Sequence, residues 1–159
     1  MEELGFKWLK TDAGLLLYRK GKEIILAIIY VDNAQVYGPS KALVEKIKAA
    51  FMKKWECHDL RETTEFLQIK IHRDGCQLAI DQCEYLKKVL EHCRIINAKP
   101  AHIPLPEGYK SSTSTAPVNL ELQTRFQTVI GFLLYLMLGT RPDIAYAVTL
   151  MAQMSANPT

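Results

Sequence analysis

The sequence predicts an α+β fold, in which an antiparallel sheet with one helix precedes a mostly helical half. An unbroken apolar run from Ile24 to Val31 has the length and isoleucine content of a strand buried on both faces. Residues 67–80 alternate between apolar and polar side chains around Asp74-Gly75, which is typical of a hairpin. After residue 81 the apolar spacing changes to the helical period. The predicted boundary between the two halves therefore lies near residue 80.

The first half contains strands on both sides of a polar, glycine-containing connection. Residues 15–18 and the run from Ile24 form the two strands, and residues 19–23 suit the turn between them. Asp32-Asn33 ends the second strand with a turn, and Ser40 is a candidate N-cap for a helix over 41–54. The buried face of this helix is predicted to carry Leu43, Val44, Ile47 and Phe51.

The 67–80 hairpin is predicted to bury Leu67, Ile69 and Ile71, with Gln68 on the opposite face of the same strand. Asp81 and Glu84 resemble a capping box for the next helix, which buries Leu86, Val89, Leu90 and Cys93. Residues 99–119 are rich in proline and serine and predict an extended connector, mobile around 110–116. An apolar helix follows over Leu122–Met137 and ends at Gly139-Thr140, and Pro142 opens the last helix.

Composition narrows the class of protein only loosely. The chain has 159 residues, 48% of them hydrophobic, and a formal net charge of +3, which permits nucleic-acid binding without arguing for it. No stretch predicts a membrane span, and the first residues lack the plan of a signal peptide. The four cysteines show no C-x-x-C spacing, so we expect reduced thiols in a cytoplasmic or nuclear protein rather than a zinc site.

Five stretches together resemble one family. In order, they are LGFKWLKTDAGLLLYRKG, YVDNAQVYG, WECHDLRETTEFLQIKIHR, LAIDQCEYLKKVLEHCRIINAKPAHIPL and FQTVIGFLLYLMLGTRPDIAYAVTLMAQMSANPT. They resemble the C-terminal half of the reverse-transcriptase domain of copia-type retrotransposon polyproteins. TRPDIAYAV is especially characteristic of that lineage. YVDN differs by one residue from YVDD, the metal-binding hairpin turn of reverse transcriptases.

The resemblance implies a truncated polymerase. Residues 1–80 would form a partial palm with the primer-grip hairpin, and residues 81–159 would form a helical, thumb-like subdomain. The family holds two Mg²⁺ ions with carboxylates for phosphoryl transfer. One of those aspartates would lie upstream of Met1, and Asn33 replaces another, so that Asp32 alone remains. We therefore expect no bound cofactor, no polymerase activity from this chain alone, and at most a vestigial metal ligand in Asp32.

Other positions also depart from the family pattern. Arg61 and Gln68 stand where glycine is usual, and Gln127 and Phe132 replace an arginine and a small polar residue. A glycine at 68 could admit the close approach of a nucleic-acid backbone, and glutamine would fill that space. The resemblance nevertheless makes five residues candidates for nucleic-acid contact: Gln68, Lys70, Lys87, Lys88 and Arg94. Solvated lysines on a helix face are the ordinary alternative.

Three classes of function remain open at this point. We favour a retroelement-derived module that is catalytically inactive alone and is kept for binding RNA, DNA or a hybrid, or for self-association. The alternatives are part of a polymerase completed by another chain, and a regulatory module that binds proteins. Truncation would expose the apolar sheet formed by the Leu15 and Ile24 strands, and exposed sheets associate. We therefore expect a homo-oligomer that forms through this sheet.

Overall fold

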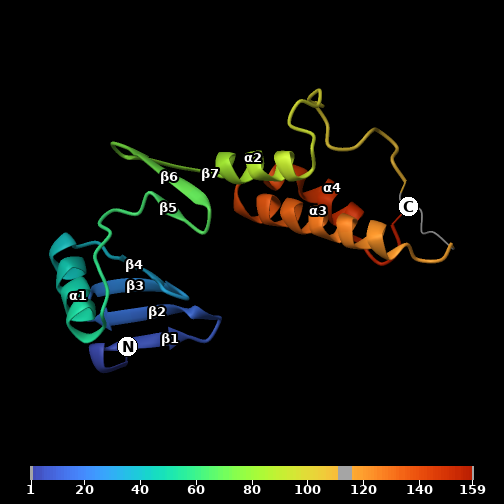
Figure 1. The fold of residues 1–159 in the computed structure, drawn as a ribbon. Coiled ribbons are helices and arrows are strands. Elements are labelled where there is room, and N and C mark those ends of the chain that lie inside the picture. The colour runs from blue at the N-terminus through green and yellow to red at the C-terminus, as the bar shows by residue number, and fades with distance from the viewer. Residues whose placement is uncertain (1, 111–115, 159) are drawn as a thin grey trace. The chain divides into compact units, whose positions relative to one another are not determined.

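The computed structural model describes residues 2–110 and 116–158 and divides the chain into two compact units, Met1–Thr63 and Thr64–Thr159 (Figure 1). Each unit contains an antiparallel sheet and at least one helix, so the predicted α+β class is confirmed. Most of the segment predicted to be mobile, residues 111–115, lies outside the described residues. None of the described helices is long and apolar enough to span a membrane.

The first unit is a four-stranded antiparallel meander with a helix on one face (Figure 1). A short 3-10 helix, η1 (Glu2–Leu4), leads into β1 (Phe6–Leu9), β2 (Asp12–Lys20), β3 (Glu23–Tyr30) and β4 (Asn33–Tyr37). The helix α1 (Lys41–Lys54) begins at Ser40, whose hydroxyl accepts from the backbone N–H of Leu43 at 3.4 Å. The predicted hairpin, N-cap and helix are therefore confirmed.

The core of this unit lies between the sheet and α1. The fully enclosed side chains are Phe6, Leu16, Ile25 and Ala27, and Ile47 covers them from the helix. Leu43, Val44 and Phe51 pack against this cluster, as the helical spacing predicted. Because a strand turns alternate side chains to opposite faces, only every second residue of β3 reaches the core.

The prediction that β3 is buried on both faces is wrong. Ile24 is 44% exposed and Tyr30 is 52% exposed, while Ile25 and Ala27 on the other face are completely buried. The pairing of β3 with β2 and β4 is antiparallel, and α1 covers one face of the sheet. An unbroken apolar run is typical of a strand between two layers, but within this unit the second layer is missing.

The second unit begins with a small sheet and ends in helices. Its strands are β5 (Glu65–Phe66), β6 (Ile69–Asp74) and β7 (Gln77–Asp81), in the order β5-β6-β7. The helices are α2 (Cys83–His92), α3 (Leu120–Gly139) and α4 (Ala145–Ala152), with a 3-10 turn, η2 (Pro142–Ile144), before α4. The sequence analysis grouped the hairpin with the first half at residue 80, whereas the structure groups it with the helices from Thr64 onward.

Aromatic side chains join α2 to α3. The ring of Tyr85 meets Tyr135 edge-on with centroids 4.8 Å apart, and Phe132 lies between Tyr85 and His92 at 6.5 and 5.1 Å. Edge-to-face geometry is favoured because the positive ring edge meets the negative ring face. Phe132, which departs from the family pattern, is therefore part of the packing between these helices.

Candidate functional site

The β3–β4 turn places Asp32 and Asn33 at one end of the first sheet. Tyr30 pairs with Asn33, so the two residues of the turn are Val31 and Asp32. Val31 is 87% exposed and has a φ of 54°, a left-handed conformation that is unfavourable for a β-branched residue. The tight turn thus carries its strain at Val31. Asn33 lies in β4, so the turn predicted at Asp32-Asn33 is displaced by one residue to Val31-Asp32.

The donor set at this turn consists of one carboxylate and one amide. Asn33 Nδ2 lies 3.4 Å from Asp32 Oδ1, and both residues are exposed. Within the described ranges 2–110 and 116–158, no three His, Cys, Asp or Glu side chains are grouped so that they could hold a metal ion. A pair of Mg²⁺ ions needs several anionic oxygens, which these residues do not provide. The described residues therefore do not fit a two-metal site.

Gln68 lies in a turn, so its predicted place inside a strand is wrong. Phe66 pairs with Ile69, and the two residues between them, Leu67 and Gln68, have φ of 50° and 60°. Two successive positive φ angles define a type I′ turn, in which glycine is favoured at no steric cost. Leu67 is also not buried, at 39% exposed, because it belongs to this turn and not to the apolar face of the strand.

Arg61 adopts the same kind of backbone conformation. Its φ is 67°, and its N–H donates to Asp59 Oδ1 at 2.8 Å. Arg61 and Gln68 were the two positions at which the sequence analysis noted a usual glycine. At both positions, the left-handed backbone conformation is sufficient to explain the preference for glycine, and no close approach of a nucleic acid is needed.

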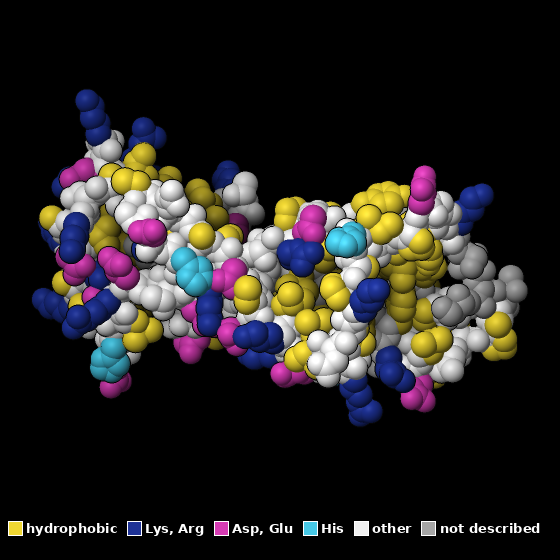
Figure 2. All heavy atoms as spheres, turned by 90° about the horizontal axis from the view of Figure 1, so that it is seen from above, with side chains coloured by type: hydrophobic (Ala, Val, Ile, Leu, Met, Phe, Trp, Pro, Cys, Tyr) yellow, Lys and Arg dark blue, Asp and Glu magenta, His cyan; other side chains and the backbone are white. Residues whose placement is uncertain are grey.

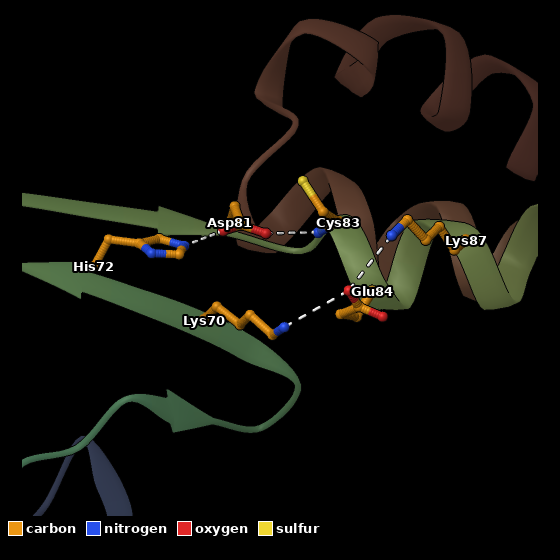
Figure 3. A network of polar contacts seen from close by, with 6 residues as sticks. All are labelled: Lys70, His72, Asp81, Cys83, Glu84 and Lys87. Carbon is orange, nitrogen blue, oxygen red and sulfur yellow. Dashed lines mark hydrogen bonds and ion pairs between the residues drawn. The ribbon is translucent and has the colours of Figure 1, made fainter.

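The remaining candidate residues lie around α2. Figure 3 shows Lys70 of β6 and Lys87 of α2 converging on Glu84, at N···O distances of 3.6 and 3.5 Å. These two lysines lower the pKa of Glu84 through their charge. Since each lysine has a carboxylate beside it, part of its charge is already compensated.

Lys88 and Arg94 are exposed, and the structure gives neither an ion pair among the described residues. Arg94 has a φ of 57° and follows the C-terminus of α2, where its N–H donates to the carbonyl of Glu91 and the N–H of Ile95 donates to that of Leu90. This is a Schellman motif, in which glycine is the usual residue. The backbone of Arg94 therefore ends the helix, and its guanidinium is left in solvent.

A second polar network, which the sequence analysis interpreted only as a helix cap, connects β6, β7 and α2 (Figure 3). Asp81 accepts from the backbone N–H of Cys83 at 2.8 Å and pairs with the ring of His72 through its other oxygen. The N–H donor first, and His72 second, lower the pKa of Asp81 to about 2. The register of the hairpin could have shown this pair, because His72 lies opposite Ala79 and thus diagonal to Asp81.

A buried glutamine, which was not predicted from the sequence, connects the junction of β7 and α2 to α3. Gln82 is 3% exposed, and its Oε1 accepts from the hydroxyl of Thr140 at 2.9 Å. A Cβ on Gly139 would lie 2.3 Å from the same oxygen, so a larger residue at 139 would force the Gln82 amide to move. The hydroxyl of Tyr135 also donates to the carbonyl of Leu67, which joins α3 to the β5–β6 turn.

Gln127 has a structural contact at the other end of α3. Its Nε2 donates to the carbonyl of Ser155 at 2.9 Å, and Gln123 donates to that of Ala156 at 2.7 Å. These amides satisfy backbone acceptors beyond the end of α4. The side-chain amide of Gln127 is therefore used in a contact within the second unit.

Charged side chains are not gathered into one tract on the face that Figure 2 displays. Lys and Arg side chains are interspersed there with acidic and hydrophobic ones. On that face, the positive charges are therefore separate cations and do not form an extended basic surface.

The family model described as reverse transcriptase (RNA-dependent DNA polymerase) matches residues 1–107, which include both sheets and α2. The chain belongs to this family. It is 32% identical to a retrovirus-related Pol polyprotein from transposon TNT 1-94 of Nicotiana tabacum over 95% of its own length, and 30% identical to that from transposon RE1 of Arabidopsis thaliana over 98%. An uncharacterized mitochondrial protein of Arabidopsis thaliana is 34% identical over 83% of the chain.

The chain spans only a small part of these polyproteins, 12% of the first and 10% of the second, and 54% of the mitochondrial protein. No solved structure matches the chain. The relatives thus identify a fragment of reverse-transcriptase type, and their own activities do not transfer to it directly.

Proposed function

We propose that this chain is a retroelement-derived reverse-transcriptase fragment that does not polymerise DNA on its own and serves as a binding module. The first unit would correspond to the later part of the palm, and α2–α4 to the thumb. The observation that carries the proposal is the β3–β4 turn, where exposed Asp32 has an amide beside it in place of a second carboxylate.

The chemistry of phosphoryl transfer supports the loss of activity. Two metal ions stabilise the attacking and the leaving oxygen, and each needs several oxygen ligands to stay in place. Replacing aspartate by asparagine keeps the shape of the side chain and removes its charge. Asp32 alone then resembles an ordinary turn residue more than a catalytic ligand.

Primer extension tests this part of the proposal. The full chain with Mg²⁺, a primer–template hybrid and deoxynucleotides is expected to give no extension, and neither is the Asn33→Asp variant, because one restored carboxylate does not complete the donor set. Mg²⁺-dependent extension by the unmodified chain, lost in Asp32→Ala, would overturn the proposal. Extension that requires a second chain would instead favour a polymerase part completed in trans.

Nucleic acid is the first proposed ligand of the module. Lys88 and Arg94 are uncompensated cations near the end of α2, and Lys70, Lys87 and Gln68 lie in the same unit. Phosphate contacts need only placed positive charge, so binding would weaken steeply as salt is added.

We expect Lys88→Gln with Arg94→Gln to weaken hybrid binding more than a matched pair in the β2–β3 turn region, Lys20→Gln with Lys22→Gln. An equal loss of binding affinity in both pairs would show that the nucleic acid does not bind at α2.

Self-association is the second proposed property, and the outer face of the first sheet supports it. This face, opposite α1, carries a continuous apolar set: Leu15, Leu17, Ile24, Leu26, Ile28 and Tyr30. Apolar faces of this kind are typical of association surfaces. Leu26→Lys is expected to lower the solution mass of an oligomer formed there, whereas Leu60→Lys, on an exposed loop of the same unit, is not. An unchanged mass in Leu26→Lys would exclude this face.

A further inference from the structure

The edge of the second sheet formed by β7 has no neighbouring strand. In the order β5-β6-β7, residues 77–81 pair with β6 on one side, and no described element pairs with them on the other. An unpaired edge offers a row of backbone donors and acceptors to any strand that can reach it. Two side chains on this strand, Leu78 and Ile80, are apolar and 62% and 50% exposed.

β7 lacks the devices that protect two other edge strands of this protein, β1 and β5. On β1, the outer strand of the first sheet, the pairing slips between Trp8 and Leu9, and Lys7 adds a charge. β5 has only two residues. β7 has five residues, no lysine, arginine or proline, and one charge, on Asp81, whose carboxylate is already engaged with the ring of His72 and the backbone N–H of Cys83. By the usual rules of edge protection, β7 is therefore open to pairing.

The hairpin register fixes which backbone groups point outward. Asp74 and Gln77 close a two-residue turn at Gly75 and Cys76, so these two residues exchange hydrogen bonds with each other. The direction then alternates, so Gln77, Ala79 and Asp81 bond inward to β6. The N–H and C=O groups of Leu78 and Ile80 consequently point away from the sheet.

We propose that β7 pairs with β7 of a second copy of this chain, in an antiparallel arrangement with its two-fold axis at Ala79. In this register Leu78 of each copy faces Ile80 of the other, so the outward groups of all four residues meet and form backbone hydrogen bonds. Any other two-fold register brings fewer of these groups together. The interface is isologous, as closed dimers require.

The side chains are self-complementary in the same register. Leu78 and Ile80 of the two copies form an apolar cross-strand set, continued on each side by Ile71 opposite Ile80. Ala79 meets its own copy at a pair without hydrogen bonds, where the backbones approach most closely and a small residue fits. Asp81 faces the neutral Gln77, so no like charges are opposed. The start of the second copy's α2 falls opposite Gly75, beside which there is open space.

A site-directed cross-link tests both the partner and the register. In a background with Cys57, Cys76 and Cys83 changed to serine, Ala79→Cys is expected to give a disulfide dimer under mild oxidation. The two Cα atoms would be about 4.5 Å apart, within reach of a disulfide. Gln77→Cys is the matched control, because its two copies would lie about 14 Å apart along the strands. Ala79→Cys that cross-links no faster than Gln77→Cys overturns the proposal.

Solution mass provides the second readout. Sedimentation of the Leu26→Lys variant, in which the outer face of the first sheet is disrupted, is expected to show a dimer. Adding Leu78→Lys with Ile80→Lys converts this dimer to monomer, whereas adding Leu138→Lys, 79% exposed on α3, leaves it intact. A monomeric Leu26→Lys variant, or a dimer unchanged by the two lysines in β7, rejects the proposal. Circular dichroism verifies that the lysine variants are folded. If they are not, the cross-linking of Ala79→Cys, which is a smaller change, tests whether β7 forms the dimer. This edge is independent of the outer face of the first sheet, which Leu26→Lys tests separately.

Discussion

The two units of this protein are stabilised in different ways. In the first, Phe6, Leu16, Ile25 and Ala27 are 0–1% exposed, and a helix covers them. In the second, the buried amide of Gln82 connects the junction of β7 and α2 to the end of α3, and edge-on aromatic rings join α2 to α3. An apolar core tolerates other apolar residues of similar size, whereas the amide of Gln82 occupies the space beside Gly139 that a larger side chain would need. The comparison shows that the two sheets of this chain are held in place by different kinds of packing.

The largest expected effect is in the core of the first unit. Leu16→Ala removes a completely buried side chain and is expected to lower the free energy of unfolding by about 3 kcal/mol, since the cavity does not fully collapse. Both tryptophans, Trp8 and Trp55, lie in this unit, so fluorescence during urea unfolding reports it specifically. Leu60→Ala, at a side chain 83% exposed, is the control and should change stability by less than about 0.5 kcal/mol. Similar losses in both variants would contradict the assigned core.

The second unit is tested by two glycines of one helix. Gly139→Ala places a methyl group 2.3 Å from Gln82 Oε1 and is expected to destabilise the unit by about 1–3 kcal/mol. Gly131→Ala meets nothing within 4 Å and should stabilise α3 by about 0.5–1 kcal/mol. Hydrogen exchange of the α3 amides distinguishes the two. If both changes stabilise the helix, Gln82 does not occupy this position in solution.

The β5–β6 turn separates backbone strain from packing. Replacing Leu67-Gln68 by Asn-Gly gives the residues that a type I′ turn favours, and is expected to stabilise the hairpin by about 1 kcal/mol. Gly75→Ala provides the opposite control, because its φ of 55° is unfavourable for alanine although space is free. Chemical unfolding followed by circular dichroism measures both. A destabilised Asn-Gly variant would show that Leu67 contributes packing instead of strain.

The smallest effect concerns acid stability at the junction of β7 and α2. The pKa of Asp81 is lowered to about 2, so its interactions stabilise the fold above its ordinary pKa and are lost as the pH falls toward about 2. The melting temperature of Asp81→Asn should therefore lie below that of the wild type at pH 5, with the difference shrinking toward pH 2. Asp74→Asn, at the tip of the same hairpin, is the control for removing a carboxylate from this hairpin. A constant difference across this pH range would exclude Asp81 as the source.

The elements of this fold could be predicted where a local pattern was sufficient. Ser40 and the spacing from Leu43 to Phe51 specified α1, and the alternation from Ile69 onward specified the β6–β7 hairpin. The turn at Leu67-Gln68 was missed because neither residue signals a positive φ. The exposure of one face of β3 was not predicted, because an apolar run does not reveal how many layers of the fold enclose the strand.

The candidate site was predictable in composition and only partly in geometry. The sequence places an amide, Asn33, beside Asp32 and a group of lysines near α2, and the binding role of these lysines stays a prediction. The contact between Gln82 and Gly139 joins residues far apart in the chain, so no spacing rule could find it. The left-handed conformations of Arg61, Gln68 and Arg94 could not be predicted from the sequence, because only the backbone angles of the structure reveal them.

The central claim is that the β3–β4 turn has kept its shape and lost its metal site. Titration of Mn²⁺ followed by electron paramagnetic resonance tests it most directly, because Mn²⁺ occupies the oxygen-rich sites that Mg²⁺ uses. The wild type and Asp32→Ala are expected to give the same weak, non-saturating binding. Saturable binding of two ions by the wild type that is lost in Asp32→Ala would contradict the account.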